Sequence, residues 1–115
     1  MSLKNILQRI NGKSSYQKLQ DVLDRAFEQA SIGKGKERHA TNEPFESQLI
    51  CEISGRLHSF DGNIFQAIKK MIESKRLFQM REKDRAVNEI LGAINYMAAA
   101  VILIEENFDK VEWYK

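Results

Sequence analysis

Apolar residues recur every three or four positions along most of the chain, which is the period of an α-helix and not of a strand. The pattern predicts a short amphipathic helix that ends at Asn11-Gly12. It predicts a second helix from about Ser14, capped by its hydroxyl together with Gln17, to a stop at Gly33. The apolar stripe of that helix consists of Leu19, Val22, Leu23, Ala26, Phe27 and Ala30.

Two further helices are predicted in the middle of the chain. Residues 33–44 have no period and read as a loop, after which a helix begins at Pro44 behind an Asn42 cap. Residues 58–62 break that helix. Asn63, followed by Gln66, has the spacing of a capping residue for the next helix, which runs to about residue 79.

The last helix, from about Asp84 to Asn107, is apolar on nearly every side. We expect its main buried stripe to be Val87, Ile90, Leu91, Ile94, Ala98, Val101 and Ile102. A helix of this kind belongs in the middle of a bundle or in an oligomer interface. Residues 108–115 form an aromatic tail that should also pack against something.

The predicted fold is therefore an all-α single domain over residues 1–115. It is a bundle of four main helices with a short N-terminal helix within residues 1–12. Because four helices cannot easily surround the last one on every side, we expect a homodimer to complete the bundle.

Composition excludes several classes of protein. The 115 residues, 43% hydrophobic and 30% charged, have a globular profile. The single Cys51 cannot form an internal disulfide and, without a signal peptide, indicates a reducing cytoplasm. The longest uninterrupted apolar run, residues 97–104, is too short to span a membrane. A net charge of +2, with acids interleaved among the lysines, does not favour nucleic acid.

The loop after the second helix carries candidate phosphate ligands, which are Lys34, Lys36, Arg38 and His39. Glycines at 33 and 35 would free the backbone to form an anion-binding nest, and an arginine can grip a phosphate through two hydrogen bonds. An ordinary solvated loop would be basic too. Both interpretations remain open from the residues alone.

Acidic residues on three helices are candidate ligands for a divalent ion such as Mg²⁺. Glu46 and Glu52 lie on one predicted helix, Glu73 on the next, and Glu89 on the last. Hard cations in helical bundles take inward carboxylates from facing helices. Asn95 shares a face with apolar residues and is a candidate buried polar residue, which would either form a helix–helix hydrogen bond or contact a ligand.

Two stretches resemble the metal-binding helices of the MazG-like all-α nucleotide pyrophosphohydrolases. The run Glu-Ile-Leu-Gly-Ala-Ile-Asn at 89–95 is similar to that family's Glu-Glu-Leu-Gly-Asp-Val-Leu. The run Ala-Ile-Lys-Lys-Met-Ile-Glu at 67–73 is similar to its first metal helix, which carries Glu-Glu-x-x-Glu. The resemblance covers about residues 64–104 and implies a nucleotide ligand and Mg²⁺ held by Glu73 and Glu89. Residues 33–48 are also similar to small phage- or prophage-associated proteins.

The remaining acids of the family pattern are replaced here by Ser74, Leu77, Ile90 and Ala93. Two carboxylates are too few to hold the ions and orient water in the family mechanism unless Glu46 or Glu52 substitutes. We therefore expect a phage-related cytoplasmic protein that binds a phosphate-bearing ligand such as a nucleotide without that hydrolytic mechanism. The alternative is a non-enzymatic oligomeric interaction protein with no small-molecule ligand.

Overall fold

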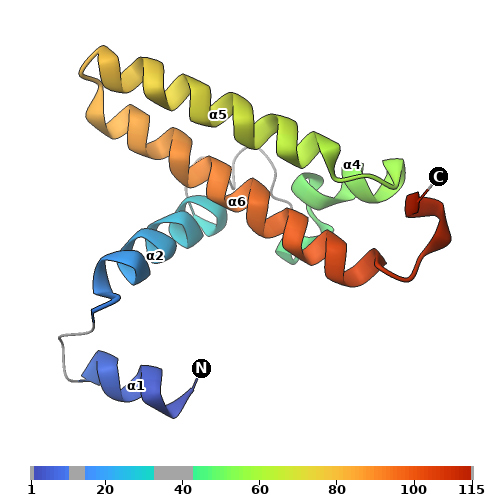
Figure 1. The fold of residues 1–115 in the computed structure, drawn as a ribbon, viewed down its shortest axis with the longest axis horizontal. Coiled ribbons are helices and arrows are strands. Elements are labelled where there is room, and N and C mark those ends of the chain that lie inside the picture. The colour runs from blue at the N-terminus through green and yellow to red at the C-terminus, as the bar shows by residue number, and fades with distance from the viewer. Residues whose placement is uncertain (1, 11–14, 33–42, 115) are drawn as a thin grey trace.

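The regular structure of the protein is helical wherever the structure describes it. The computed structural model covers residues 2–10, 15–32 and 43–114, and these ranges contain no strand (Figure 1). The α-helices are α1 (Leu3–Ile10), α2 (Gln17–Ser31), α4 (Leu49–Leu57), α5 (Asp61–Gln79) and α6 (Lys83–Asn107). Two 3-10 turns are also present, of which η1 (Phe45–Ser47) precedes α4 and η2 (Val111–Tyr114) follows α6. The predicted all-α fold, with four main helices and a short N-terminal one, is confirmed.

Helices α5 and α6 form a long antiparallel hairpin, around which the other elements are arranged (Figure 1). The residues that face each other across the hairpin are alternately four and three positions apart along each helix. We call these residues the hairpin seam. On α5 the seam is Asn63, Ala67, Lys70, Ser74 and Leu77, and on α6 it is Ala86, Glu89, Ala93, Tyr96, Ala100 and Leu103. Such a seven-residue repeat is typical of helices that pack side by side at a shallow angle.

Small side chains hold the two helices close together. Ala67, Ala93 and Ala100 are buried in the seam, and the Ser74 hydroxyl donates a 2.7 Å hydrogen bond to the Ala86 carbonyl of α6. The hairpin turn is closed by Arg81, which takes a left-handed conformation with φ of 62°, and by a bond from the Glu82 N–H to the Leu77 carbonyl.

The predicted buried stripe of α6 was therefore largely wrong. Ile90 and Val101 are 39% and 54% exposed, and Ala98 is exposed, whereas Ala99 and Leu103 are 0% and 3% exposed. Of the predicted stripe only Leu91 is buried, while Val87, Ile94 and Ile102 are half-buried. Since α6 has apolar residues on every side, hydrophobicity could not choose the face. Packing between helices chose it, because Ala93 and Ala100 admit the α5 backbone and Ala99 packs against α4.

A neighbouring side of α6 packs against α2 and α4. Ile50 and Cys51 of α4 form one buried cluster with Ala99 and Leu103 of α6. The partly buried rings of Phe45, Phe60, Tyr96 and Trp113 pack against that cluster. The aromatic tail thus packs through Trp113, as predicted, while Phe108 and Tyr114 stay exposed.

Two predicted helix starts are corrected. Helix α2 begins at Gln17 behind Tyr16 with no side-chain cap, and the Gln17 amide bonds to Asp21 instead of reaching back. Ser14 and Asn42 lie outside the described residues. Helix α4 begins at Leu49, because residues 45–47 after Pro44 form a 3-10 turn rather than its first α-helical turn.

Asn63 is a third correction, since it joins two helices and does not cap one. Helix α5 begins at Asp61, two residues earlier, where the Ser59 hydroxyl accepts a hydrogen bond from the Asp61 N–H. Asn63 is 2% exposed, and its amide donates to the Ile50 carbonyl at 3.0 Å while its side-chain oxygen accepts from the Ser54 hydroxyl. Leaving such groups unpaired in a core is costly, so this bond network fixes α4 against α5.

The fold is open rather than compact. Its radius of gyration is 16.2 Å, whereas a compact domain of about 100 residues has one of about 13 Å. Helix α1 lies apart from the hairpin (Figure 1), and many large apolar side chains on α2, α4, α5 and α6 are exposed. Much of the apolar surface therefore has no partner within the described part of the chain.

Helix α6 is the one helix in the described ranges that is long and apolar enough to cross a membrane. An 18-residue window has a mean hydropathy of 1.7, and 33% of it is buried. Core helices of soluble proteins pass the same test. The expectation of no membrane span, which used uninterrupted apolar runs alone, stays a prediction.

Replacing Asn63 by alanine should lower the free energy of unfolding by about 2 kcal/mol, because the Ile50 carbonyl and the Ser54 hydroxyl lose their partner inside the core. Urea unfolding followed by circular dichroism measures the change. Gln79→Ala, which removes an exposed amide from the other end of α5, is the control and should cost less than about 0.5 kcal/mol. Equal losses of unfolding free energy in the two variants would contradict the role of Asn63 in joining α4 to α5.

Candidate functional site

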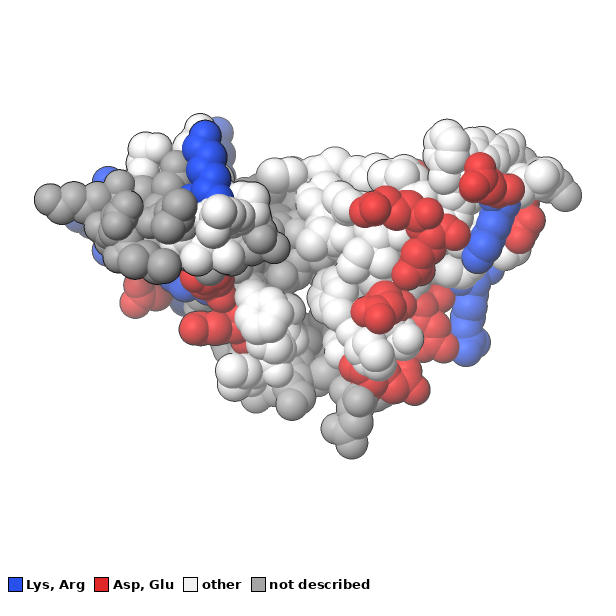
Figure 2. Space-filling view, turned by 90° about the horizontal axis from the view of Figure 1, so that it is seen from below, with Lys and Arg blue, Asp and Glu red and all other residues white. Residues whose placement is uncertain are grey.

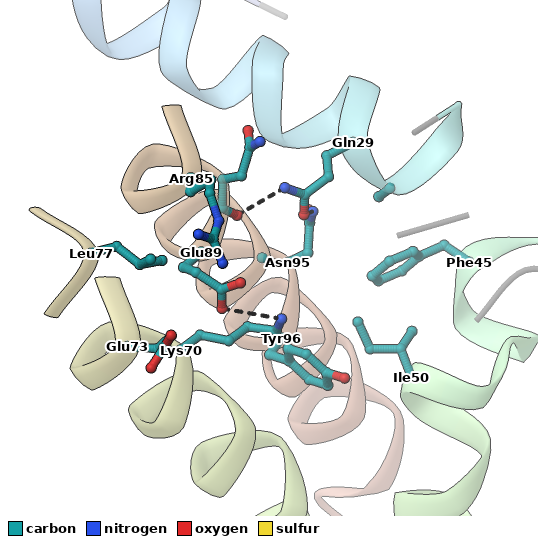
Figure 3. Close-up of a pocket in the computed structure, with 13 residues that line it drawn as sticks. Gln29, Phe45, Ile50, Lys70, Glu73, Leu77, Arg85, Glu89, Asn95 and Tyr96 are labelled. Carbon is teal, nitrogen blue, oxygen red and sulfur yellow. Dashed lines mark hydrogen bonds and ion pairs between the residues drawn. The ribbon is translucent and has the colours of Figure 1, made fainter. Parts of the chain in front are cut away.

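A cavity of about 220 Å³ lies between α2, α5 and α6, with the start of the α4 region closing one side (Figure 3). Its walls carry two cations, two carboxylates, several amides and two aromatic rings. The lining residues are Gln29, Ala30, Phe45, Ile50, Lys70, Glu73, Leu77, Arg85, Asn88, Glu89, Gly92, Asn95 and Tyr96.

An ion pair within the hairpin seam crosses the floor of the cavity. Lys70 Nζ lies 3.7 Å from Glu89 Oε2, and the two side chains are only 14% and 28% exposed. The same ammonium lies 5.9 Å from the centre of the Tyr96 ring, within reach of a cation–π attraction. A lysine, a glutamate and a tyrosine thus take positions where a hairpin would ordinarily bury apolar side chains.

Gly92 makes room for Lys70. A Cβ atom at residue 92 would lie 3.0 Å from Cδ and 3.3 Å from Nζ of Lys70, closer than side chains normally approach. The glycine of the 89–95 segment therefore lets the lysine stem cross the surface of α6 into the cavity.

The other two charged residues of the cavity, Glu73 and Arg85, differ in how closely they are paired with neighbouring charges. Glu73 accepts two hydrogen bonds from the Arg76 guanidinium, which lower the pKa of its carboxyl below the usual range with smaller help from the charge of Arg85. Arg85 itself is 63% exposed and has only a 3.9 Å contact with Glu82. In Figure 3 its side chain points toward Glu89, so its guanidinium is available at the cavity mouth.

Amides fix the wall formed by α2. The Gln29 amide donates to the Asn88 carbonyl at 2.9 Å, and the Asn95 amide donates to the Ala26 carbonyl at 2.9 Å. Asn95 is half-buried and also contacts the Gln29 side-chain oxygen at 3.5 Å. The predicted helix–helix hydrogen bond of Asn95 is thus present, and it places the residue at the edge of the cavity.

The structure brings together two of the four predicted metal-binding acids. Glu73 and Glu89 line the cavity from α5 and α6, whereas Glu46 is exposed outside it and Glu52 pairs with Arg56 at 2.7 Å. Among the residues the structure describes, no group of three or more histidine, cysteine, aspartate or glutamate side chains is close enough to hold a metal ion.

The predicted phosphate ligands Lys34, Lys36, Arg38 and His39 lie outside the described residues. The chain on either side of them is described, and both Ala30 before the loop and Phe45 after it line the cavity.

Sequence reasoning missed Lys70 and Arg85 as site residues, because it treated the basic residues of the hairpin as a solvated surface. One signal was available for Lys70. It occupies a seam position between Ala67 and Ser74, where a four-and-three repeat otherwise places small or apolar residues.

Acidic charge gathers elsewhere, near the C-terminal end of α6. Figure 2 shows acidic side chains spread over that end of the molecule as seen from below. In sequence this end carries Glu105, Glu106, Asp109 and Glu112, all exposed. An anionic ligand should therefore be repelled from this end of the molecule.

No family model, no curated protein and no solved structure matches this chain. The resemblance to the MazG-like family and to phage proteins therefore stays a prediction, and function has to be argued from the site.

The lone Cys51 is buried, and burial, reinforced by the carboxylates of Glu106 and Glu46, raises the pKa of its thiol to about 11. The thiol is thus neutral at physiological pH and is a poor nucleophile. It packs as a small apolar side chain in the α4–α6 cluster.

Burial of the Cys51 thiol predicts a loss of stability at alkaline pH. Folding favours the protonated thiol, so its contribution to stability is complete below 9.0, the ordinary pKa of a cysteine thiol, and is lost as pH rises through about 11. Between pH 8 and pH 11 the protein should lose on the order of 2 kcal/mol more stability than a Cys51→Ala variant. Urea unfolding of both proteins over this range measures the difference, and parallel curves would contradict it.

Proposed function

We propose that the protein binds a phosphate-bearing small molecule, such as a nucleotide, in the cavity between α2, α5 and α6. The observation that carries this proposal is the meeting of Glu73 and Glu89 with Lys70 and Arg85 on one cavity wall (Figure 3). These residues come from two helices, and the tertiary structure places them together.

The lining suits the two parts of such a ligand. The exposed guanidinium of Arg85 can form paired hydrogen bonds with a phosphate, and Lys70 adds a second positive charge. The rings of Tyr96 and Phe45 and the nearby amides offer contacts for a base. A volume of about 220 Å³ is below the ~300 Å³ at which ligand pockets usually begin, so the cavity fits one part of a nucleotide rather than all of it.

A divalent cation would resolve the charge conflict in the cavity. Two carboxylates and two cations give the wall no net positive charge, and the carboxylates would repel a bare phosphate. Mg²⁺ held by Glu73 and Glu89 would bridge them to phosphate oxygens, with water completing its shell, as it does in many nucleotide sites. Binding should therefore be stronger with Mg²⁺ than without it.

The basic loop would hold the rest of the ligand. Ala30 and Phe45, which lie on either side of it in sequence, line the cavity. In this proposal Lys34, Lys36, Arg38 and His39 contact phosphates that extend beyond the cavity.

Binding is proposed here without hydrolysis by the MazG-like mechanism, which uses more acids than the two that line the cavity. The protein would then be a degenerate, phage-related relative of that family, acting in the cytoplasm.

Isothermal titration with nucleoside di- and triphosphates, with and without Mg²⁺, tests the proposal. Arg85→Ala should weaken binding at least tenfold, because one charge-assisted phosphate contact is worth about 1.5–3 kcal/mol. Arg56→Ala is a matched control, since Arg56 is also an exposed arginine in a short-range ion pair on a helix but lies outside the cavity lining.

Equal affinity of these two variants for the nucleotide would contradict binding in the cavity. The absence of binding heat at millimolar nucleotide would contradict nucleotide binding altogether. The second outcome would leave the alternative, an oligomeric interaction protein without a ligand. The extensive exposed apolar surface of the protomer favours that alternative as the second candidate.

A further inference from the structure

We propose that one face of the α5–α6 hairpin binds the same face of a second copy of this chain, in antiparallel orientation, to form a four-helix bundle. We call it the bare hairpin face. It consists of Ile64, Ile68, Met71 and Phe78 on α5 and of Ile90, Ile94, Met97, Val101 and Ile104 on α6. The proposal does not depend on ligand binding, because none of these residues lines the cavity.

A second repeat follows the hairpin seam along both helices. Each member of the bare hairpin face stands one position after a seam residue, so that Ile64 follows Asn63 on α5 and Ile90 follows Glu89 on α6. The face therefore inherits the four-and-three spacing of the seam. Its one polar position on α5 is Lys75, which follows Ser74.

The two halves of this face point to the same side of the hairpin. One residue along an α-helix turns the side-chain direction by about 100°. Seen from one end of the hairpin, the chain turns counterclockwise along one helix and clockwise along its antiparallel partner. A step of one residue from the seam therefore turns the side chains of both helices toward the same side of the hairpin. The face is thus a single apolar surface that spans both helices.

The other side of α6 already has partners. Leu91 and Ala99 are buried there, and the Asn95 amide is bonded to α2. The bare hairpin face is mostly exposed in the described part of the chain, since Val101, Met71 and Phe78 are 54%, 47% and 74% exposed and only Ile94 is half-buried.

The exposed area of the face is large enough to form the centre of a dimer interface. Eight of its nine residues have exposed fractions of 38% to 74%. An aromatic side chain buries about 150–250 Å², and a smaller aliphatic one about 100 Å². The face therefore presents about 500 Å² of apolar area, which is more than half of the ~800 Å² that each partner buries in a standard protein–protein interface.

A lipid bilayer is a poorer occupant than a second copy. Helix α6 is apolar enough to cross a membrane, but it is packed along its length against α5. Taking α5 into the bilayer as well would bury Lys69, Lys75 and Arg76, each at a cost of about 2.5–3.5 kcal/mol near the membrane centre.

Charge at the two ends of the face favours the antiparallel orientation. Lys75 and Lys83 lie toward the turn of the hairpin, whereas Glu105 lies toward its open end, where acidic residues gather (Figure 2). Two copies in antiparallel orientation would set the basic end of each against the acidic end of the other. Parallel copies would set like charges together.

Sedimentation velocity over a range of protein concentrations tests the proposal. The wild-type protein should sediment as a dimer of twice 13.3 kDa. Val101→Glu should raise the dissociation constant at least about a hundredfold, because it places two unpaired carboxylates in an apolar interface. Since Val101 is exposed in the protomer, the variant should keep its helical circular dichroism.

Val111→Glu provides the matched control, because Val111 is a 68% exposed valine in η2, outside the two helices of the hairpin. It should leave the dimer intact. A monomeric wild-type protein at about 100 μM or an unchanged dissociation constant for Val101→Glu would overturn the proposal. So would a wild-type protein that floats with liposomes as a monomer.

Charge reversal tests the orientation. Lys83→Glu and Glu105→Lys should each weaken the dimer, and the double variant should recover most of the affinity, since the opposed charges are only exchanged. No recovery in the double variant would overturn the antiparallel orientation.

Discussion

The close approach of α5 and α6 is the constraint on which the rest of the structure depends. Alanines at 67, 93 and 100 and the bond from Ser74 to the Ala86 carbonyl bring the two backbones together along most of their length. Larger side chains could not occupy these positions without pushing the helices apart. At these positions the hairpin therefore selects residues by size first and by hydrophobicity second.

This sorting explains two features that look unrelated. Since alanines and Ser74 bring the two helices together at several seam positions, large apolar side chains such as Met71 and Val101 lie on the outside, where they are exposed. The narrow seam also leaves space at Gly92 for the Lys70 stem, so a lysine–glutamate pair can lie at the edge of the core and line a cavity. The apolar surface and the charged cavity are both consequences of one packing choice, and they lie on different sides of the hairpin.

The cavity owes its shape to polar joints between helices. Asn95 and Gln29 tie α2 to α6 through main-chain carbonyls, and Asn63 ties α5 to α4. Leaving a buried amide without a hydrogen-bond partner costs more free energy than forming the bond contributes. These hydrogen bonds therefore specify one arrangement of the helices. That specificity is what allows a site to be built from residues on three separate helices.

The sequence by itself determined the helical class, the number of main helices and the length of α6, because these follow from local apolar periodicity and helix-stop signals. It also identified Glu73 and Glu89 as residues to be considered together, and Asn95 as a residue between helices. It could not choose the buried face of α6, since that helix is apolar on every side and Ala99 and Val101 look alike to a periodicity argument.

Only the tertiary structure decided which residues meet. It made Asn63 a joint rather than a cap, left Glu46 and Glu52 outside the cavity, and brought Lys70 to Glu89 from another helix. Such outcomes depend on the fit of side-chain volumes between elements distant in sequence, and local spacing carries no information about that fit.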